Sequence, residues 1–186
     1  ETIALLTTLV WPLAEVAFVI QRKSQNERTK CTKGGGAGIV WLVAVSSTLL
    51  GLSTRFLEIL PLPFADLPLA LCGAVLVLLG ASLRFYAIWI LGAFFTVDVA
   101  VSSDHTLVKR GLYRHIRHPG YTGLLVAFLG VGVITGSWIG LALVTVPVAA
   151  VLVRRIRVEE RALGKCFGVA YQGYRHLERA LLSRAA

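Results

Sequence analysis

Long apolar runs separated by short polar segments make up most of this 186-residue chain. A bilayer core about 30 Å thick is crossed by about 20 apolar residues in a helix. The pattern therefore predicts five membrane-spanning helices, at residues 2–20, 37–60, 67–95, 121–135 and 138–153. The fourth run would rise only about 23 Å as an α-helix. We expect it to begin inside the preceding loop or to lie at an angle.

Composition supports the same class of protein. Hydrophobic residues make up 56% of the chain and charged residues 16%, and the mean hydropathy is +0.73. Soluble domains have about 45–50% apolar and about 25% charged residues. We expect an all-α integral membrane protein in which residues 1–186 form a single membrane domain. The cysteines at 31, 72 and 166 are widely spaced, so no disulfide framework is expected.

The basic residues indicate how the helices are oriented. All but two of the 19 Lys and Arg residues lie in 21–36, in 96–120 or after residue 153. Five spans with the amino terminus outside place these segments on one side, whereas "PLPFAD" (61–66) and "GS" (136–137) on the other side carry no Lys or Arg. The positive-inside rule makes the basic side, with the carboxy terminus, cytoplasmic. A net charge of +9 also predicts contact with anionic lipid headgroups, and we expect no nucleic-acid partner.

Two ionisable residues, Glu15 and Arg84, fall inside predicted spans. Charged groups are costly in lipid, so they indicate a partner or a lined cavity. The alternative is snorkelling to the interface, which suits Arg84 near the inner end of its helix.

The polar segment 96–120 leads into the stretch "HTLVKRGLYRHIRHPGYTG" (105–123), which is rich in histidine, arginine, glycine and tyrosine. Val97, Val99 and Val101 alternate as in a short strand, and the "HPG" at 118–120 indicates a tight turn. Such a loop offers backbone donors and acceptors at the mouth of a helical bundle, which suits a polar cofactor. We expect no metal site, because Pro119 interrupts the helix that would align His115 with His118.

The second polar segment, 154–182, begins with "RRIRVEERALGKCFG" and continues the fifth helix past the membrane. Arg155 and Glu159 are four residues apart, so they share a helical face and can converge on one ligand. They can equally form a solvated ion pair worth about 0.3–0.5 kcal/mol. Glu160 points about 100° away. We expect Gly164 and Gly168 to break the helix before an amphipathic stretch that lies on the bundle or the interface.

Taken in order, these two motifs closely resemble the isoprenylcysteine carboxyl methyltransferase family. The first motif is the stretch 105–123; the second consists of Arg155, Glu159, Glu160, Phe167, Gly168, Tyr171 and Tyr174. The resemblance covers about residues 96–178. It implies a membrane-embedded enzyme that uses S-adenosylmethionine without a soluble Rossmann domain, with a cytosolic cofactor-binding loop and a helical tail.

The resemblance also implies the site residues. Two stretches of the first motif match the walls of the cofactor site: His105, Thr106, Leu107 and Val108 on one side, and Tyr113, His118, Pro119, Gly120 and Tyr121 on the other. Glu159 matches a carboxylate that binds the cofactor, and Arg155 matches a guanidinium near the substrate. Asp98 replaces a cofactor-contacting Gln of animal members, and its carboxylate can still accept from an amino or hydroxyl group.

The implied reaction is carboxyl O-methylation of a prenylcysteine-like or other lipophilic acid, which enters sideways between helices. A carboxylate with a pKa of about 3.5 is already ionised at pH 7, so no general base is required. One alternative is methylation of a small thiol or a phospholipid amine, for which His115 or Tyr113 would remove the proton. The others are an NADPH-dependent sterol-type reductase, which is usually longer, and a non-catalytic adaptor that binds anionic lipid.

Overall fold

The computed structural model describes residues 32–34, 37–58, 60–64, 66–92, 95, 99–101, 108 and 110–185. Within these ranges the chain forms four α-helices, one 3-10 turn and a two-stranded sheet. In chain order the elements are β1 (Thr32–Gly34), α2 (Ala37–Phe56), α3 (Asp66–Leu91), β2 (Val99–Val101), η2 (Gly111–Arg114), α4 (Pro119–Ile134) and α5 (Trp138–Ala185). The predicted span 2–20, with Glu15, lies outside the described residues. The bundle is helical as predicted, and a small sheet is added at one end.

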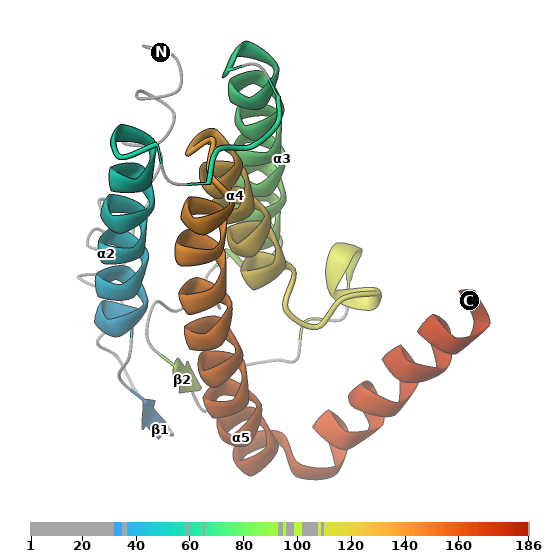
Figure 1. The fold of residues 1–186 in the computed structure, drawn as a ribbon. Coiled ribbons are helices and arrows are strands. Elements are labelled where there is room, and N and C mark those ends of the chain that lie inside the picture. Colours follow the sequence, from blue (N-terminus) through green and yellow to red (C-terminus); the bar gives the residue numbers. More distant parts are fainter. Residues whose placement is uncertain are drawn as a thin grey trace.

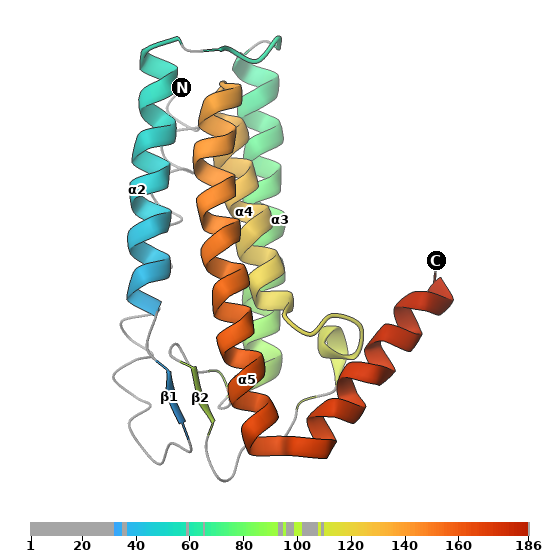
Figure 2. The same cartoon turned by 60° about the horizontal axis from the view of Figure 1, so that its bottom comes forward.

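The four helices form an up-and-down bundle (Figure 1). α3 packs along α4, α4 against α5, and α5 against α2, so α4 and α5 occupy its middle (Figure 2). The core is built from branched aliphatic side chains around one buried aromatic ring. Its fully buried members include Phe128, Val131, Val144 and Val148.

Glycines allow α3 and α4 to approach backbone to backbone. Gly73 and Gly80 on α3 are seven residues apart and lie against Gly130 and Gly123 on α4. A Cβ atom added to Gly80 would overlap the backbone nitrogen of Ala127, and one added to Gly130 would lie 2.5 Å from the carbonyl oxygen of Gly73. Small residues play this part in membrane helix pairs, because packing drives their association when lipid is as apolar as the side chains.

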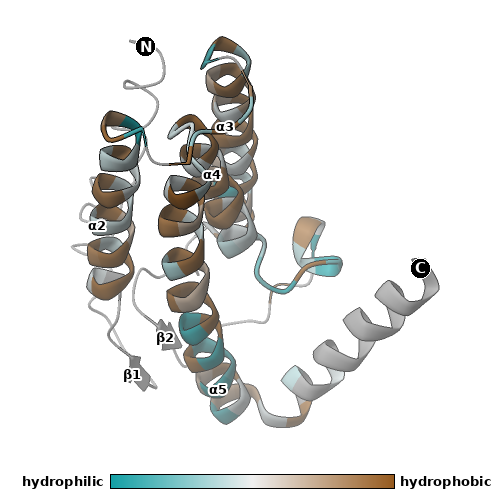
Figure 3. Cartoon of the chain, viewed as in Figure 1, coloured by the Kyte–Doolittle hydropathy of each residue, from teal (hydrophilic) through white to brown (hydrophobic). Residues whose placement is uncertain are grey.

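The outward faces of the helices are apolar (Figure 3). Leu42 is 71% exposed, Leu78 62%, Trp89 76% and Val146 64%. The segments Gly38–Phe56, Asp66–Leu91 and Trp138–Val169 are long and apolar enough to cross a membrane, whereas α4 has only 16 residues. Such a belt of exposed apolar side chains is what lipid contact requires. These helices correspond to three predicted spans, and the fourth is short, as expected.

The two ends of the bundle differ as the charge pattern predicts. At one end the N–H of Leu62 donates to the carbonyl of Gly136 at 2.8 Å, and that of Trp138 to Leu60 at 3.1 Å. The two Lys- and Arg-free loops therefore meet. α2 ends at Phe56, short of the predicted residue 60, and this places Arg55 here in an ion pair with Asp66 at 3.3 Å.

At the other end, the three predicted basic segments come together. β1 comes from the first segment and β2 from the second, and they pair antiparallel with Thr32 opposite Val101. α5, which carries the third segment, contacts both strands. The alternation at Val99 and Val101 is thus a strand, as predicted. The cytoplasmic location of this end stays a prediction.

α5 extends well past the apolar bundle and then changes direction. Gly168 has φ 48° and ψ −120°, a left-handed conformation that interrupts the helix, and the chain turns sharply there (Figure 2). The predicted break at Gly168 is confirmed. A break at Gly164 was wrong, because the helix continues through it.

Candidate functional site

The first turn of α4 forms one side of the candidate site. The helix begins at Pro119, two residues before the predicted span, with His118 as its N-cap. Proline suits this position because the first helical N–H has no partner within the helix. The amides of Tyr121 and Thr122 both donate to the carbonyl of His118 at 3.1 Å, and the Thr122 hydroxyl donates to it at 3.2 Å. The "HPGY" motif is therefore ordered helix rather than open loop.

α5 faces this turn with Arg155. Arg155 is buried, at 9% exposed, and its Nε donates to the Tyr121 hydroxyl at 3.0 Å. The half-buried Glu159, one helical turn further on, lies close enough to this hydroxyl to interact with it electrostatically. Three of the predicted site residues, from the two separate motifs, thus meet at one phenol.

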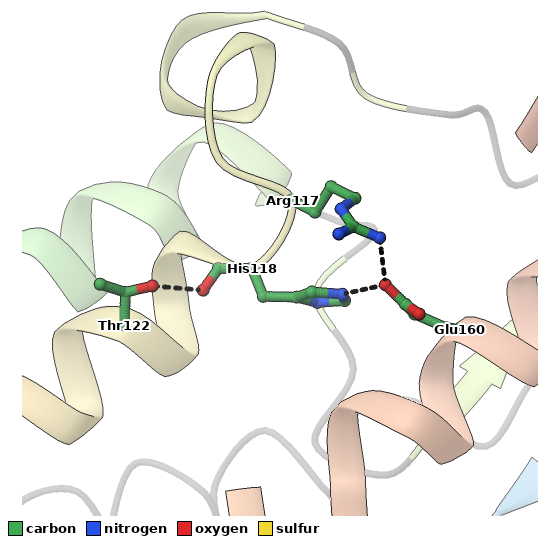
Figure 4. A network of polar contacts seen from close by, with 4 residues as sticks. All are labelled: Arg117, His118, Thr122 and Glu160. Carbon is green, nitrogen blue, oxygen red and sulfur yellow. Dashed lines mark hydrogen bonds and ion pairs between the residues drawn. The ribbon is translucent and has the colours of Figure 1, made fainter. Parts of the chain in front are cut away.

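A second contact between the same elements involves Glu160. Its Oε1 accepts from Arg117 Nη1 at 2.6 Å and lies 3.4 Å from His118 Nε2 (Figure 4). Sequence reasoning gave Glu160 no role, because it lies on a different face of α5 from Arg155 and Glu159. The signal that was missed is chemical: a second carboxylate on α5, Glu160, is complementary in charge to the adjacent Arg117 and His118 before α4.

α3 contributes Arg84, which is only 6% exposed. Its Nη1 donates to the carbonyl of Gly120 at 3.3 Å. Burial and this contact favour a partner inside the protein over snorkelling. Arg84 thereby connects α3 to the first turn of α4, directly beside Tyr121.

The remaining predicted site residues are placed as follows. Tyr113 is half-buried on η2, which lies between the bundle and the part of α5 beyond Gly168 (Figures 1 and 2). Val108 is half-buried and His115 is exposed. His105, Thr106, Leu107 and Asp98 lie outside the described residues. In the tail motif, Tyr171 is buried at 3% exposed, and Phe167 packs near Ala162.

The resulting site combines carboxylates, guanidinium groups, an imidazole and a phenol at the polar end of an apolar bundle. Polar residues, coloured teal, concentrate on the part of α5 at this end, and apolar residues, coloured brown, follow along the bundle (Figure 3). Such an arrangement offers groups for a small ligand that carries both positive and negative charges.

Comparison with protein families gives this geometry a context. The family model described as "Isoprenylcysteine carboxyl methyltransferase (ICMT) family" matches residues 73–165, half of the chain. The match runs from α3 into α5 and includes Arg84, the first turn of α4, and Arg155 to Glu160. The chain belongs to the isoprenylcysteine carboxyl methyltransferase family.

Several curated proteins resemble this family member over about half of its length. A probable protein-S-isoprenylcysteine O-methyltransferase of Oryza sativa subsp. indica is 32% identical over 104 residues, covering 55% of this chain and 54% of the rice protein. Protein-S-isoprenylcysteine O-methyltransferase of Schizosaccharomyces pombe is 34% identical, over 52% of this chain and 42% of its own. Protein-S-isoprenylcysteine O-methyltransferase A of Arabidopsis thaliana is 33% identical, over 55% and 53%. The chain spans about half the length of the relatives that it matches.

Proposed function

We propose that this family member is a membrane-embedded methyltransferase that uses S-adenosylmethionine to methylate the carboxylate of a prenylcysteine-like or other lipophilic acid. The observation that carries the proposal is the meeting of Arg155, Glu159 and Tyr121 at the polar end of a lipid-facing bundle. The printed names of the relatives support the same activity, although each match covers only part of those proteins.

The residues present fit the proposed cofactor. S-adenosylmethionine supplies a methyl group on a positively charged sulfur, and it also carries a ribose and an amino-acid group. Glu159 offers a half-buried carboxylate for amino or hydroxyl groups. The rings of His118 and Tyr121 lie next to each other, with centroids 5.8 Å apart and planes tilted by 32°. In this proposal Asp98, His105, Thr106, Leu107, Val108 and Tyr113 complete the cofactor site.

Arg155 is proposed to orient the acceptor carboxylate. Its hydrogen bond to Tyr121 holds the guanidinium in place and occupies one of its N–H donors. Arg155 then binds the acceptor carboxylate less tightly, and the carboxylate keeps its nucleophilicity. The reaction joins an anion and a cation into neutral products, which a pocket of low dielectric favours because water no longer stabilises the separate charges. An ionised acceptor requires no general base.

We place the basic end in the cytoplasm and the amino terminus outside, with residues 2–20 as a further span, on the positive-inside rule. Four cations on α5 are exposed and fall within an arc of about 80° around the helix. They are Arg154, Arg157, Arg161 and Lys165. In the proposal this basic stripe contacts anionic headgroups, which attract such residues close to the membrane.

Isothermal titration calorimetry of the purified protein tests the cofactor. S-adenosylmethionine is expected to bind at micromolar concentration, and Glu159→Ala to abolish binding. Asp66→Asn serves as the control, because it removes a carboxylate in an ion pair at the opposite end of the bundle. Absence of binding to the wild type, or unchanged binding in Glu159→Ala, would overturn the proposal.

A tritiated-methyl assay then identifies the acceptor. Label is expected in a prenylcysteine-type carboxylate and not in small thiols or phosphatidylethanolamine. Label in a small thiol or in phosphatidylethanolamine would change the proposed acceptor but leave the proposed cofactor unchanged. Tight binding of NADPH in place of S-adenosylmethionine would instead favour a reductase.

A further inference from the structure

Glu160 connects α5 to the residues that precede α4 through a single oxygen atom. Oε1 accepts the 2.6 Å hydrogen bond from Arg117 and lies 3.4 Å from the His118 ring nitrogen (Figure 4). The three side chains are only 25%, 20% and 12% exposed for Arg117, Glu160 and His118. A short, charge-assisted contact with this much burial is stronger than an ordinary surface ion pair.

This contact acts on the same turn that presents Tyr121. The His118 carbonyl accepts from the amides of Tyr121 and Thr122, so the position of His118 sets the position of the whole first turn. The Arg155–Tyr121 hydrogen bond is one point of attachment between this turn and α5. Glu160, five residues after Arg155, provides a second. Together with the Arg84–Gly120 contact to α3, these two points fix the orientation of the turn, and Glu160 adds the attachment at its N-cap.

We propose that Glu160 is a positioning residue, which holds Arg117 and His118 on α5 and so fixes the turn from His118 to Tyr121 toward Arg155 and Glu159. The inference rests on the proposed function in that the turn is taken to form a wall of the cofactor site. Glu160 acts through its two partners and contacts neither cofactor nor acceptor. Its loss is therefore expected to weaken cofactor binding more than it slows the methyl-transfer step.

The first experiment measures the attachment without any ligand. Hydrogen–deuterium exchange with mass spectrometry is carried out on full-length wild-type protein, Glu160→Gln and the control Asp66→Asn. Faster exchange is expected over residues 117–122 in Glu160→Gln only, because the freed turn opens more often. Asp66→Asn is expected to change exchange only near its own partner, Arg55. Unchanged exchange over 117–122 in Glu160→Gln would overturn the proposal, whatever the protein binds.

The second experiment measures the functional effect. Glu160→Gln is expected to raise both the Kd and the KM for S-adenosylmethionine about tenfold, equivalent to about 1.4 kcal/mol. kcat at saturating cofactor is expected to stay within roughly twofold, since the residue does not act in the transition state. A merely structural role would lower the melting temperature and the active fraction but leave Kd and KM unchanged, and that result would overturn the proposal.

A double-mutant cycle with Arg117 identifies the contact responsible. Arg117→Gln is expected to raise the Kd as Glu160→Gln does, and the double variant to be no worse than either, because both remove one interaction. The exchanged pair, Arg117→Glu with Glu160→Arg, is expected to recover part of the affinity. Additive effects and no recovery would assign Glu160 a role independent of Arg117. If the wild-type protein binds no S-adenosylmethionine, the proposed function is contradicted. The hydrogen–deuterium exchange measurement would still decide whether Glu160 holds the turn.

Discussion

The Tyr121 hydroxyl accepts a 3.0 Å hydrogen bond from Arg155 Nε, across 34 residues of chain. The carboxylate of Glu159 lies near the same hydroxyl and interacts with it electrostatically. Tyr121 thus lies beside a guanidinium and a carboxylate that share one face of α5. Tyr121 is therefore placed to set the separation of the two charged groups that the proposed reaction uses.

Tyr121→Phe tests this arrangement with minimal change in shape. We expect methyl transfer to fall about tenfold or more, because Arg155 loses its hydrogen bond to Tyr121 and such bonds to charged groups are worth about 1.5–3 kcal/mol. The measurement is kcat and KM for donor and acceptor in the tritiated-methyl assay. Tyr86→Phe is the control, since it removes the same hydroxyl from an exposed position on α3. Full activity in Tyr121→Phe would show that the hydroxyl does not organise the site.

Gly80→Ala is expected to destabilise the bundle by at least about 2 kcal/mol, because the new methyl group overlaps the α4 backbone at Ala127 and overpacking forces the helices apart. Thermal unfolding in detergent measures the loss. Gly164→Ala is the matched control: this glycine is helical and has nothing within 4 Å of an added Cβ atom. There, alanine is expected to be neutral or to stabilise by up to about 1 kcal/mol. Equal melting temperatures for the two variants would contradict the close packing of α3 on α4.

Gly168→Ala is expected to cost about 1–3 kcal/mol, since a φ of 48° with a ψ of −120° is strained for any residue with a Cβ atom. The strain is relieved if α5 straightens, which would remove Tyr171 from its buried position. Faster hydrogen–deuterium exchange around residues 166–173 is the expected readout. Gly173→Ala, beyond the kink and with open space around it, is expected to leave exchange unchanged. The same behaviour in both variants would mean that the kink does not depend on glycine.

Replacing the four cations of the basic stripe with glutamine is expected to weaken binding of phosphatidylglycerol, by about 1 kcal/mol for each residue near the surface. Native mass spectrometry of detergent-solubilised protein, titrated with phosphatidylglycerol and with neutral phosphatidylcholine, compares the two lipids. Arg55→Gln, at the other end of the bundle, is the single-charge control. A quadruple variant that retains the wild-type preference for phosphatidylglycerol would exclude the stripe as its binding surface.

The helices that face lipid were predictable because a bilayer demands a long apolar run for each crossing. That requirement located α2, α3 and the first part of α5 to within a few residues. Their ends were less predictable: α2 stops at Phe56 because the chain then turns to meet the α4–α5 loop, a contact between distant segments. α4 starts at Pro119, where proline favours a helix start that hydropathy alone does not register.

The site was predictable where residues share a helix and not where two elements meet. Spacing alone placed Arg155 and Glu159 on one face of α5. Glu160 was missed because its partner, Arg117, lies 43 residues earlier and reaches it only through the packing of α4 against α5. Gly168 and Gly164 look alike in the sequence, yet only the former adopts positive φ, and the difference depends on where the tail packs.

Gly73 packs against Gly130 and Gly80 against Gly123 so closely that no space remains for a hydrocarbon chain between α3 and α4. A prenyl or acyl tail cannot slide in through that pair of helices. In the proposed reaction a lipophilic acceptor would therefore have to reach Tyr121 between other helices. Substitutions along the α3–α4 junction are expected to change the thermal stability of the protein without changing the lengths of acceptor tail that it uses.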